Sequence, residues 1–368
     1  MMNKNEWKKV KLENVCDILD NKRIPITASK RKKGVYPYYG ANGIQDYVDD
    51  YIFNDELILL AEDGGNFGSK TKPIAYRVSG KCWVNNHAHV LKAKENFMIS
   101  DFLCYSLMFY DVTKIINGAT RLKLTQSAMR NMLVPLPELR EQEKIVKKLQ
   151  CIEEILKKKK EQIKYLENLV KFQFLKIFGD PILNEKNWKT EKLFKVAPIT
   201  QYIGKFDEKI WLLNLDMIEA NTGKIIKYNY TNLENIPLST YKFSEENVLY
   251  SKLRPYLNKV VIPNNRGYVT SEMLPLKPNP LLLNRYFFAY LLRCETFVDF
   301  IKNKVSGTKM PRVSMEELKQ FDCILPPIEL QNKFADFVKQ VDKSKVELQK
   351  SIDETQLLFD SLMDKYFG

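Results

Sequence analysis

The side chains that could bind a metal ion in this sequence centre on its only two histidines. His87 and His89 are separated by one residue, so in a strand both would point to the same face of a sheet. With Asp63 or Glu62 they could supply a set of metal ligands. The matching stretch in the second half of the chain, Thr270–Leu274, contains no histidine, so such a site would exist in one half only. We therefore expect no metal site.

Motifs for nucleotide binding, methyl transfer and DNA cleavage are incomplete. The glycine-rich stretch Gly64–Thr71 lacks the spacing G-x-x-x-x-G-K-[ST] of a phosphate-binding loop, and no G-x-G-x-x-G follows a predicted strand. Pro326-Pro327 lacks the preceding Asn or Asp and the following aromatic residue of an amino-methyltransferase motif. Glu316–Lys319 has acids beside a lysine, as metal-dependent nucleases require, but without a convincing upstream aspartate a solvated helix face explains it better. We expect no catalytic residues and no cofactor in this chain.

The charge of the chain points instead to a polyanionic partner. Among 368 residues, 58 Lys and Arg stand against 45 Asp and Glu, which gives a net charge of +13 at pH 7. Such an excess favours DNA or RNA as a partner. Six cysteines without a C-x-x-C pair indicate neither a zinc ribbon nor a disulfide framework, and no apolar run resembles a signal peptide or a membrane span. The sequence therefore predicts a cytoplasmic protein that binds nucleic acid and no membrane.

Basic and polar residues beside glycine turns are the candidates for contacts with nucleic acid. Residues 118–123 and 307–312 each place cations next to a glycine, and residues 30–33 and 251–259 add further cations. Such loops suit phosphate contacts, and arginine or asparagine can also recognise base edges in the major groove. Each stretch alone could equally be a solvated surface, but two of them recur in both halves of the chain. The predicted DNA-contacting residues are Lys30, Arg31, Lys32, Lys33, Asn66, Lys70, Asn86, His87, Arg121, Lys123, Lys252, Arg254, Lys259, Lys309 and Arg312.

An internal repeat organises the chain. Residues 118–179 superpose on residues 307–368 without a gap, at an offset of 189 residues. Leu136-Pro137 then falls on Leu325-Pro326, and Gln142 falls on Gln331. The chain is therefore two copies of one unit, each a variable region followed by a more uniform tail.

The tail of each copy is predicted to be a long helix with an apolar seam. Apolar residues step by four and three from Ile145 and again from Phe334, and prolines precede both starts. Lys159 and Thr355 are among the polar positions of the two seams. An apolar seam must be buried, and the obvious partner is the helix of the other copy, packed antiparallel, although the seams could instead drive homodimerisation. The predicted seam residues are Ile145, Leu149, Ile152, Leu156, Ile163, Leu166, Val170, Phe334, Val338, Val341, Leu348, Ile352 and Phe359.

The variable regions have the pattern of mixed helix and strand. Short apolar runs separated by glycines predict strands near residues 57–60, 89–91, 247–251 and 260–263. Helices are predicted at residues 102–116 and 285–302. Each copy is therefore α+β with an appended long helix.

This organisation resembles the DNA-specificity (S) subunit of type I restriction-modification enzymes over essentially the whole chain. Residues 136–146 are similar to the family's PLPPLxEQxxIV entry into its spacer helix, and Phe178–Pro181 is similar to the segment that closes it. Residues 85–90 and 251–260 resemble pieces of the family's target-recognition domains. The second copy departs from the pattern because Leu330 precedes Gln331 where Glu-Gln is usual, but the glutamine is kept.

The resemblance implies an α+β fold with two α/β target-recognition domains joined by two long antiparallel coiled-coil spacer helices, related by a pseudo-two-fold axis. The target-recognition domains would span residues 1–140 and 180–328, and the spacer helices residues 141–179 and 329–368. Each domain would bind one half of an asymmetric bipartite DNA target. The chain itself would be non-catalytic.

The partners implied by the resemblance are double-stranded DNA, two modification subunits and the restriction subunits. The modification subunits would use S-adenosylmethionine to methylate adenine N6 of a flipped base, and the restriction subunits would use ATP and Mg. Exposed apolar surface on the spacer helices would dock the modification subunits. Two other classes stay open: a self-contained nuclease or methyltransferase would need a motif that we do not find, and a pure coiled-coil scaffold would leave two basic domains without a role.

Overall fold

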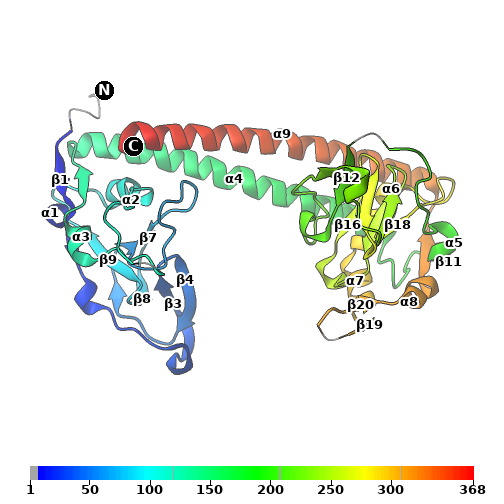
Figure 1. Cartoon of the computed structure of the whole chain (residues 1–368), viewed down its shortest axis with the longest axis horizontal. Helices are drawn as coiled ribbons and strands as arrows, with labels where there is room; N and C mark the ends of the chain where they lie inside the picture. Colours follow the sequence, from blue (N-terminus) through cyan, green and yellow to red (C-terminus); the bar gives the residue numbers. More distant parts are fainter. Residues whose placement is uncertain (1–6, 119, 207–208, 308) are drawn as a thin grey trace. The chain divides into compact units, whose positions relative to one another are not determined.

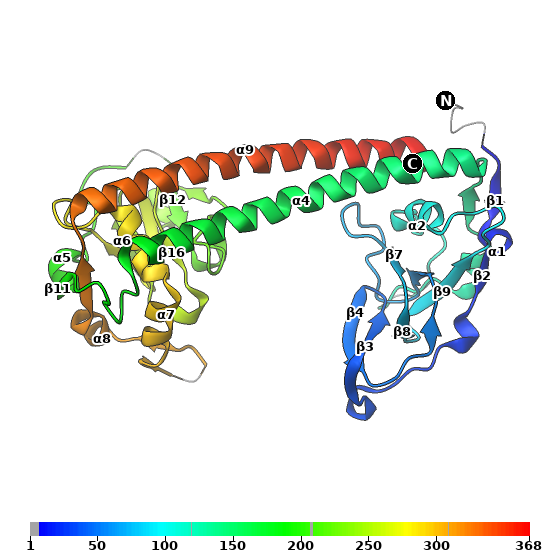
Figure 2. The same ribbon diagram turned by 180° about the vertical axis from the view of Figure 1, so that it is seen from behind.

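The computed structural model describes residues 7–118, 120–206, 209–307 and 309–368 (Figures 1 and 2). Ala119 and Thr308 of the predicted basic loops, and Met1–Glu6 of the predicted first domain, lie outside the described residues. The chain divides into two compact units. The first unit consists of Met1–Lys159 with Lys350–Gly368, and the second of Lys160–Gln349.

The first unit is built on two four-stranded sheets. Its strands are β1 (Lys9–Lys11), β2 (Cys16–Ile18), β3 (Lys33–Gly40), β4 (Gly43–Val48), β5 (Phe53–Asn54), β6 (Leu57–Ala61), β7 (Ala75–Val78), β8 (Lys81–Val84), β9 (Ala88–Ala93) and β10 (Leu133–Pro135), with helices α1 (Leu12–Val15), α2 (Ser100–Met108) and α3 (Gln126–Arg130). One sheet has the antiparallel order β2-β9-β6-β7, and the other has the order β4-β3-β8-β5. β6 is buried along its whole length, so its end is a rigid support.

The second unit repeats this plan with different details. Its strands are β11 (Lys189–Lys192), β12 (Ile210–Leu213), β13 (Tyr230–Thr231), β14 (Thr240–Phe243), β15 (Val248–Ser251), β16 (Val260–Val261), β17 (Gly267–Thr270), β18 (Met273–Leu276), β19 (Val305–Ser306), β20 (Arg312–Val313) and β21 (Asp322–Leu325), with helices α5 (Leu193–Val196), α6 (Arg285–Arg293), α7 (Glu295–Lys302) and α8 (Met315–Gln320). The larger sheets have the orders β13-β12-β17-β14 and β16-β15-β18. The pair β11–β21 corresponds to β1–β10 of the first unit. The prediction of mixed α and β structure in both copies is confirmed.

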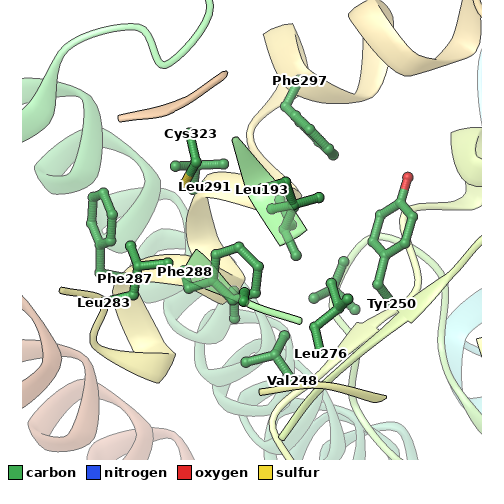
Figure 3. Packing of buried hydrophobic residues seen from close by; sticks show 14 of the residues in the cluster. Leu193, Val248, Tyr250, Leu276, Leu283, Phe287, Phe288, Leu291, Phe297 and Cys323 are labelled. Atoms are coloured by element: carbon green, nitrogen blue, oxygen red, sulfur yellow. The ribbon is translucent and has the colours of Figure 1, made fainter. Parts of the chain in front are cut away.

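The core of the second unit lies between α6 and the sheet that contains β15 and β18 (Figure 3). Phe287, Phe288 and Leu291 of α6 are completely buried, and they share this core with Val248 of β15 and Leu276 of β18. Burying each of these side chains contributes about 1.5–3 kcal/mol relative to exposure. The packing therefore fixes β15, which is followed directly by Lys252 and Arg254, two of the predicted DNA-contacting residues.

Two helices of the variable regions are shorter than the sequence predicts. The prediction of a helix over 102–116 is wrong beyond Met108, because Asp111 Oδ1 accepts hydrogen bonds from Thr113 N (3.0 Å) and Thr113 Oγ1 (2.6 Å), which replace helical bonds. The predicted helix over 285–302 is broken at Cys294, whose backbone is extended, and Asn258 Nδ2 donates to the carbonyl of Arg293 at 2.9 Å. In both places a side chain satisfies backbone groups that a continuous helix would have paired.

The two long helices are α4 (Leu139–Phe178) and α9 (Ile328–Phe367), each 40 residues long. At 1.5 Å per residue each is about 60 Å long. α4 ends at Gly179, whose positive φ of 75° gives the left-handed turn that commonly terminates a helix. Within the described residues, no helix combines the length and the apolar character that crossing a membrane requires.

The helices pack against each other in both units, and in both the direction is antiparallel. In the second unit the rings of Phe174 and Phe178, near the end of α4, lie 5.6 and 5.5 Å from that of Phe334, near the start of α9. In the first unit Lys159 contacts Thr355, and α9 ends beside α2. Of the predicted seam residues, Ile145, Leu149, Ile152, Leu156, Val170, Phe334, Val338, Val341, Ile352 and Phe359 are buried, and Ile163, Leu166 and Leu348 are half-buried.

Lys159 is a charged residue inside the apolar seam of the first unit. Its Nζ donates to Ser351 Oγ at 2.7 Å, to Thr355 Oγ1 at 2.8 Å and to the Ser351 carbonyl at 3.2 Å. Both polar partners come from the facing helix, so the polar positions predicted in the two seams meet each other. The ammonium group is thereby satisfied although it is half-buried.

Gln142 and Gln331 explain why the same motif begins both long helices. Gln142 is completely buried; its Oε1 accepts from Ile99 N (2.9 Å), and its Nε2 donates to the carbonyls of Phe97 (2.8 Å) and Pro137 (2.9 Å). The second unit repeats this arrangement. Gln331 is also buried, its Oε1 accepts from Asn284 N (2.9 Å), and its Nε2 donates to the carbonyls of Leu282 (2.9 Å) and Pro326 (2.8 Å). Each amide therefore ties its long helix to the loop before α2 or α6.

The six cysteines differ in accessibility, which predicts a simple labelling result. Burial raises the pKa of Cys16 and Cys104 to about 12 and that of Cys82 to about 11, whereas Cys151 is exposed on α4. We expect the exposed thiol of Cys151 to react most rapidly with a disulfide reagent near neutral pH, ahead of the half-buried Cys294, and the substitution Cys151→Ser should abolish that fastest phase. The measurement is stopped-flow thiol titration of the native chain. A rapid phase that survives in the variant would contradict the placement of this cysteine.

Candidate nucleic-acid interface

The basic loop of the first unit is joined to the end of β6 by backbone hydrogen bonds. Leu124 N donates to the Glu62 carbonyl (2.7 Å), and Lys123 forms a β-bridge with Asp63. Glu62 N in turn donates to the His87 carbonyl just before β9 (2.9 Å). Because β6 and β9 are neighbours in a buried sheet, segments far apart in the sequence meet at one edge.

We call the side chains gathered there the first-unit edge: Glu62, Asp63, His87, Arg121 and Lys123. Arg121 Nη2 lies 2.5 Å from Asp63 Oδ1, and Lys123 Nζ lies 2.9 Å from Glu62 Oε1. His87 Nδ1 lies 2.7 Å from the same oxygen of Asp63. The side chains of Arg121 and Lys123 are 59% and 50% exposed. The acids therefore orient both cations while leaving them open to a ligand.

The second unit contains the same backbone bridge. Val313 N donates to the Lys252 carbonyl (3.0 Å), and Arg312 forms a β-bridge with Leu253. Lys252 N donates to the Glu272 carbonyl (3.0 Å), as Glu62 N does to His87. These bonds place Val313 where the first unit has Leu124, at the offset of the sequence repeat. The repeat thus extends, in space, into regions where the two sequences no longer align.

We call Lys252, Arg254, Glu272, Lys309 and Arg312 the second-unit edge. Arg312 holds Glu272 with two nitrogens, Nε at 3.0 Å from both carboxylate oxygens and Nη2 at 2.8 Å from one. The hydrogen bonds and charge of Arg312 keep the pKa of Glu272 below its usual range. Arg254 is exposed, and its backbone N donates to the Pro311 carbonyl at 2.8 Å.

The two edges share a backbone arrangement but differ in their side chains. Glu62 in the first unit corresponds to Lys252 in the second, and His87 corresponds to Glu272. Gly64 corresponds to Arg254, and both have left-handed backbones, with φ of 62° and 47°. A non-glycine residue rarely adopts this conformation. The edges therefore present different groups to a ligand at equivalent positions.

The other predicted DNA-contacting residues lie apart from these contacts or are engaged elsewhere. Arg31 stacks on the Tyr38 ring at 4.2 Å and contacts Asp46 at 3.3 Å. Lys259 Nζ donates to the Leu215 carbonyl at 2.6 Å, and burial lowers its pKa. Asn66 Nδ2 donates to the Pro73 carbonyl at 3.3 Å. The residues Lys30, Lys32, Lys33, Lys70 and Asn86 are exposed.

A buried ionic cluster, which we define as Asp20, Arg23, Glu62 and His89, lies behind the first-unit edge. Asp20 and Arg23 precede β3 and could not be recognised from the sequence, because they carry no local pattern. Ligand atoms of Asp20, Glu62 and His89 lie within 4.8 Å of one another, a spacing that could hold a metal ion. However, Arg23 Nη1 already lies 2.6 Å from Glu62, and Lys123 Nζ lies 2.9 Å from it. Side-chain cations thus already neutralise these carboxylates, and we interpret the cluster as an ion-pair network.

Comparisons with known proteins agree on one family. Residues 4–165 and 185–355 match the model of the type I restriction modification DNA specificity domain. The specificity subunit of the type I restriction enzyme EcoDI of Escherichia coli is 23% identical, over 98% of this chain and 88% of that protein. A type I specificity subunit of Haemophilus influenzae is 40% identical over 147 residues, which cover 40% of this chain and only 37% of that protein.

Solved structures show the same fold. The S subunit of the type I restriction-modification system of M. genitalium matches with a TM-score of 0.58 and 15% identity, over 100% of this chain and 99% of that one. A chain from a study of complex assembly in the type I system matches with a TM-score of 0.56 and 17% identity, over 98% and 97% of the two chains. Since two copies of the specificity domain account for most of its length, the chain belongs to the family of type I restriction-modification specificity (S) subunits.

Proposed function

We propose that this chain recognises an asymmetric bipartite DNA sequence, with one half-site read by each unit. The observation that carries the proposal is the backbone bridge shared by the first-unit and second-unit edges, which holds exposed cations in both. Arginine and lysine in such positions contact phosphates and the acceptors of guanine. The exchange of His87 for Glu272 and of Glu62 for Lys252 gives the two edges different hydrogen-bonding groups. The two half-sites should therefore differ in sequence.

The chain would act in the cytoplasm as the non-catalytic, DNA-reading part of a larger enzyme. Two adenine-N6 methyltransferase subunits would bind S-adenosylmethionine, and restriction subunits would bind ATP and Mg. The target adenine has to leave the base stack for methylation, and that step would take place in the modification subunit. The relatives are named as specificity subunits of type I restriction enzymes, and a similar chain comes from a study of complex assembly, which supports a place for this chain in a larger enzyme.

A map of N6-methyladenine across the genome of the source organism, with and without this gene, tests the proposal directly. Deletion should remove methylation from one asymmetric split motif and leave other methylated motifs unchanged. The same map gives the recognition sequence. If every motif persisted in the deletion strain although this chain co-purified with a methyltransferase subunit, the proposed role would be wrong.

Affinity for duplex DNA should fall steeply with salt, because phosphate contacts release counterions. The substitution Arg254→Gly removes one cation and, since Gly64 occupies the equivalent left-handed position, relieves rather than creates backbone strain. We expect it to lower the slope of log affinity against log salt by about 0.9, the value for one phosphate contact. Fluorescence anisotropy at several salt concentrations measures the slope, and an unchanged slope would remove Arg254 from the interface.

Equivalent exposed leucines on the long helices are candidate docking points for the modification subunits. Leu169 on α4 is 45% exposed and Leu358, its repeat equivalent on α9, is 52% exposed. Burial of either side chain by a partner would be favourable. We expect Leu169→Asp or Leu358→Asp to reduce the complex from two modification subunits to one, measured by native mass spectrometry. Asn168→Asp, on the same turn of α4, is the control and should retain both subunits.

A further inference from the structure

The buried ionic cluster contains a histidine whose hydrogen bonds fix its charge. His89 is completely buried in β9. Its Nδ1 lies 2.6 Å from Asp20 Oδ2, and its Nε2 lies 2.9 Å from the Leu124 carbonyl oxygen. A carbonyl oxygen can only accept a hydrogen bond, and so can an ionised carboxylate. Both ring nitrogens must therefore carry a proton.

Asp20 is ionised in this arrangement. Besides His89, it accepts hydrogen bonds from Val90 N at 2.9 Å and from Gln126 Nε2 at 2.9 Å, and Arg23 Nη2 lies 3.4 Å away. Burial alone would raise the pKa of Asp20, but the hydrogen bonds and charge of His89, with the other donors, outweigh burial and keep the pKa below its usual range. Because these other donors already face the carboxylate oxygens, the proton shared with His89 lies on Nδ1 and not on Asp20.

The charged groups around His89 come from three elements. Asp20 and Arg23 lie in the segment after β2, Glu62 follows β6 with an oxygen 3.6 Å from His89 Nδ1, and Lys123 holds the other oxygen of Glu62 at 2.9 Å. Burial would raise the pKa of Glu62, but hydrogen bonds from Arg23 and Lys123 lower it. Two carboxylates thus face the ring, which favours its cationic form.

His89 also holds the backbone of the DNA-facing loop. Leu124 N is bound by the Glu62 carbonyl and Leu124 O by His89 Nε2, so both backbone groups of this residue are fixed. Lys123 is the preceding residue, and Arg121 is two residues further back. The second unit has the apolar, buried Leu274 at the position of His89. The charged support therefore belongs to the first unit alone.

We propose that His89 is a charged imidazolium at neutral pH and that it positions Arg121 and Lys123 for contact with DNA. The positioning role rests on the proposed function, whereas the charge of His89 does not. A neutral ring has one N–H only, so it could donate to Asp20 or to the Leu124 carbonyl but not to both. The second unit, with the buried Leu274 in the same place, lacks this pair of hydrogen bonds.

The charge of the ring can be measured without DNA. In the full chain labelled with 15N-histidine, only His87 and His89 contribute ring signals, and His87→Gln assigns them. Long-range 1H–15N spectra should show both nitrogens of His89 protonated at neutral pH. In Asp20→Asn, the amide can donate to Nδ1, so the ring should become neutral with its proton on Nε2 and the Leu124 bond kept. A neutral ring in the unsubstituted chain would overturn the inference.

The positioning role is measured on a duplex that carries the methylated motif. His89→Leu, which copies the second unit, should weaken affinity about tenfold, the effect of losing one good contact to a base or phosphate. His89→Gln, whose amide can still donate to the Leu124 carbonyl, should retain most of the affinity. Should His89→Leu fold poorly, Asp20→Asn still tests the role, because it keeps the bond to Leu124 and should retain most of the affinity. Unaltered affinity in His89→Leu, or a tenfold loss in Asp20→Asn, would refute the positioning role. If the unsubstituted chain bound no duplex, the proposed function would fail, while the spectra would still decide the charge of His89.

Discussion

Replacing Gln331 with leucine should destabilise the second unit by about 3–6 kcal/mol. Three backbone groups lose their partners at about 1–3 kcal/mol each, and because two of them are only partly buried, the lower part of the summed range applies. Those groups are Asn284 N and the carbonyls of Leu282 and Pro326. Leucine fills a similar volume, so little of the loss would come from a cavity. A domain stable by only 5–15 kcal/mol, the usual range, would be close to unfolding. Denaturant unfolding of the full chain measures the shift.

The exposed Gln320 on α8 provides a matched control for this substitution. Its Nε2 contacts only the neighbouring Glu316, at 3.3 Å on the surface, so Gln320→Leu should change stability by less than about 0.5 kcal/mol. Gln142→Leu should repeat the large effect in the first unit. Equal stability of the Gln331 and Gln320 variants would show that the buried amide does not anchor α9.

Removing the Arg312 side chain should weaken binding to the target duplex about 100-fold. An arginine contact to guanine accounts for roughly a tenfold to hundredfold preference, and its loss leaves Glu272 as an unpaired acid facing DNA. We therefore expect Arg312→Ala to lose both the contact and the neutralisation of Glu272. The double variant Arg312→Ala with Glu272→Ala should recover about tenfold, because it removes the repulsion but not the lost contact.

The control for charge alone is Lys195→Ala. This substitution removes an exposed cation of α5, whose Nζ lies 3.2 Å from Glu191 Oε1 of β11. The affinity of the Lys195→Ala variant for the target duplex should change less than threefold. Anisotropy titrations give the affinities, and methylation maps of strains with the variants give the sequence preference. We expect Arg312→Ala to relax the motif in one half-site only. Uniform loss across both half-sites would mean that Arg312 contacts phosphate and reads no base.

The long helices could be predicted from the sequence because their signals are local. Prolines before Leu139 and Ile328, the heptad steps and Gly179 together determine where α4 and α9 run. The repeated glutamine was recognisable as a motif, but its role was not. Gln142 bonds to Phe97 and Ile99, more than forty residues away, and no spacing rule connects them.

The candidate interface was only partly predictable, because some of its contacts join residues that are far apart in the sequence. Lys123 and Arg312 could be named as candidates because they recur at the repeat offset beside glycine turns. Their partners Glu62 and Glu272 meet them only through strand pairing across the sheet, which depends on register and not on sequence distance. The contacts of Arg31 could not be predicted either, since a basic run looks solvated in sequence although this guanidinium lies over the Tyr38 ring.

The contact of Lys159 with Ser351 and Thr355 makes one alignment of the helix pair preferable to its neighbours. Sliding one helix by a heptad, about 10.5 Å, would preserve the match of apolar residues almost everywhere. It would also carry both hydroxyls away from the ammonium group. When the slide brings Leu358 and Leu362 to the places of Ser351 and Thr355, the charge lies against hydrocarbon, at a cost of several kcal/mol. The hydrogen bonds of a single lysine therefore select the native alignment of the two helices. Hydrophobic burial alone would leave the shifted alignments nearly equal to it in energy.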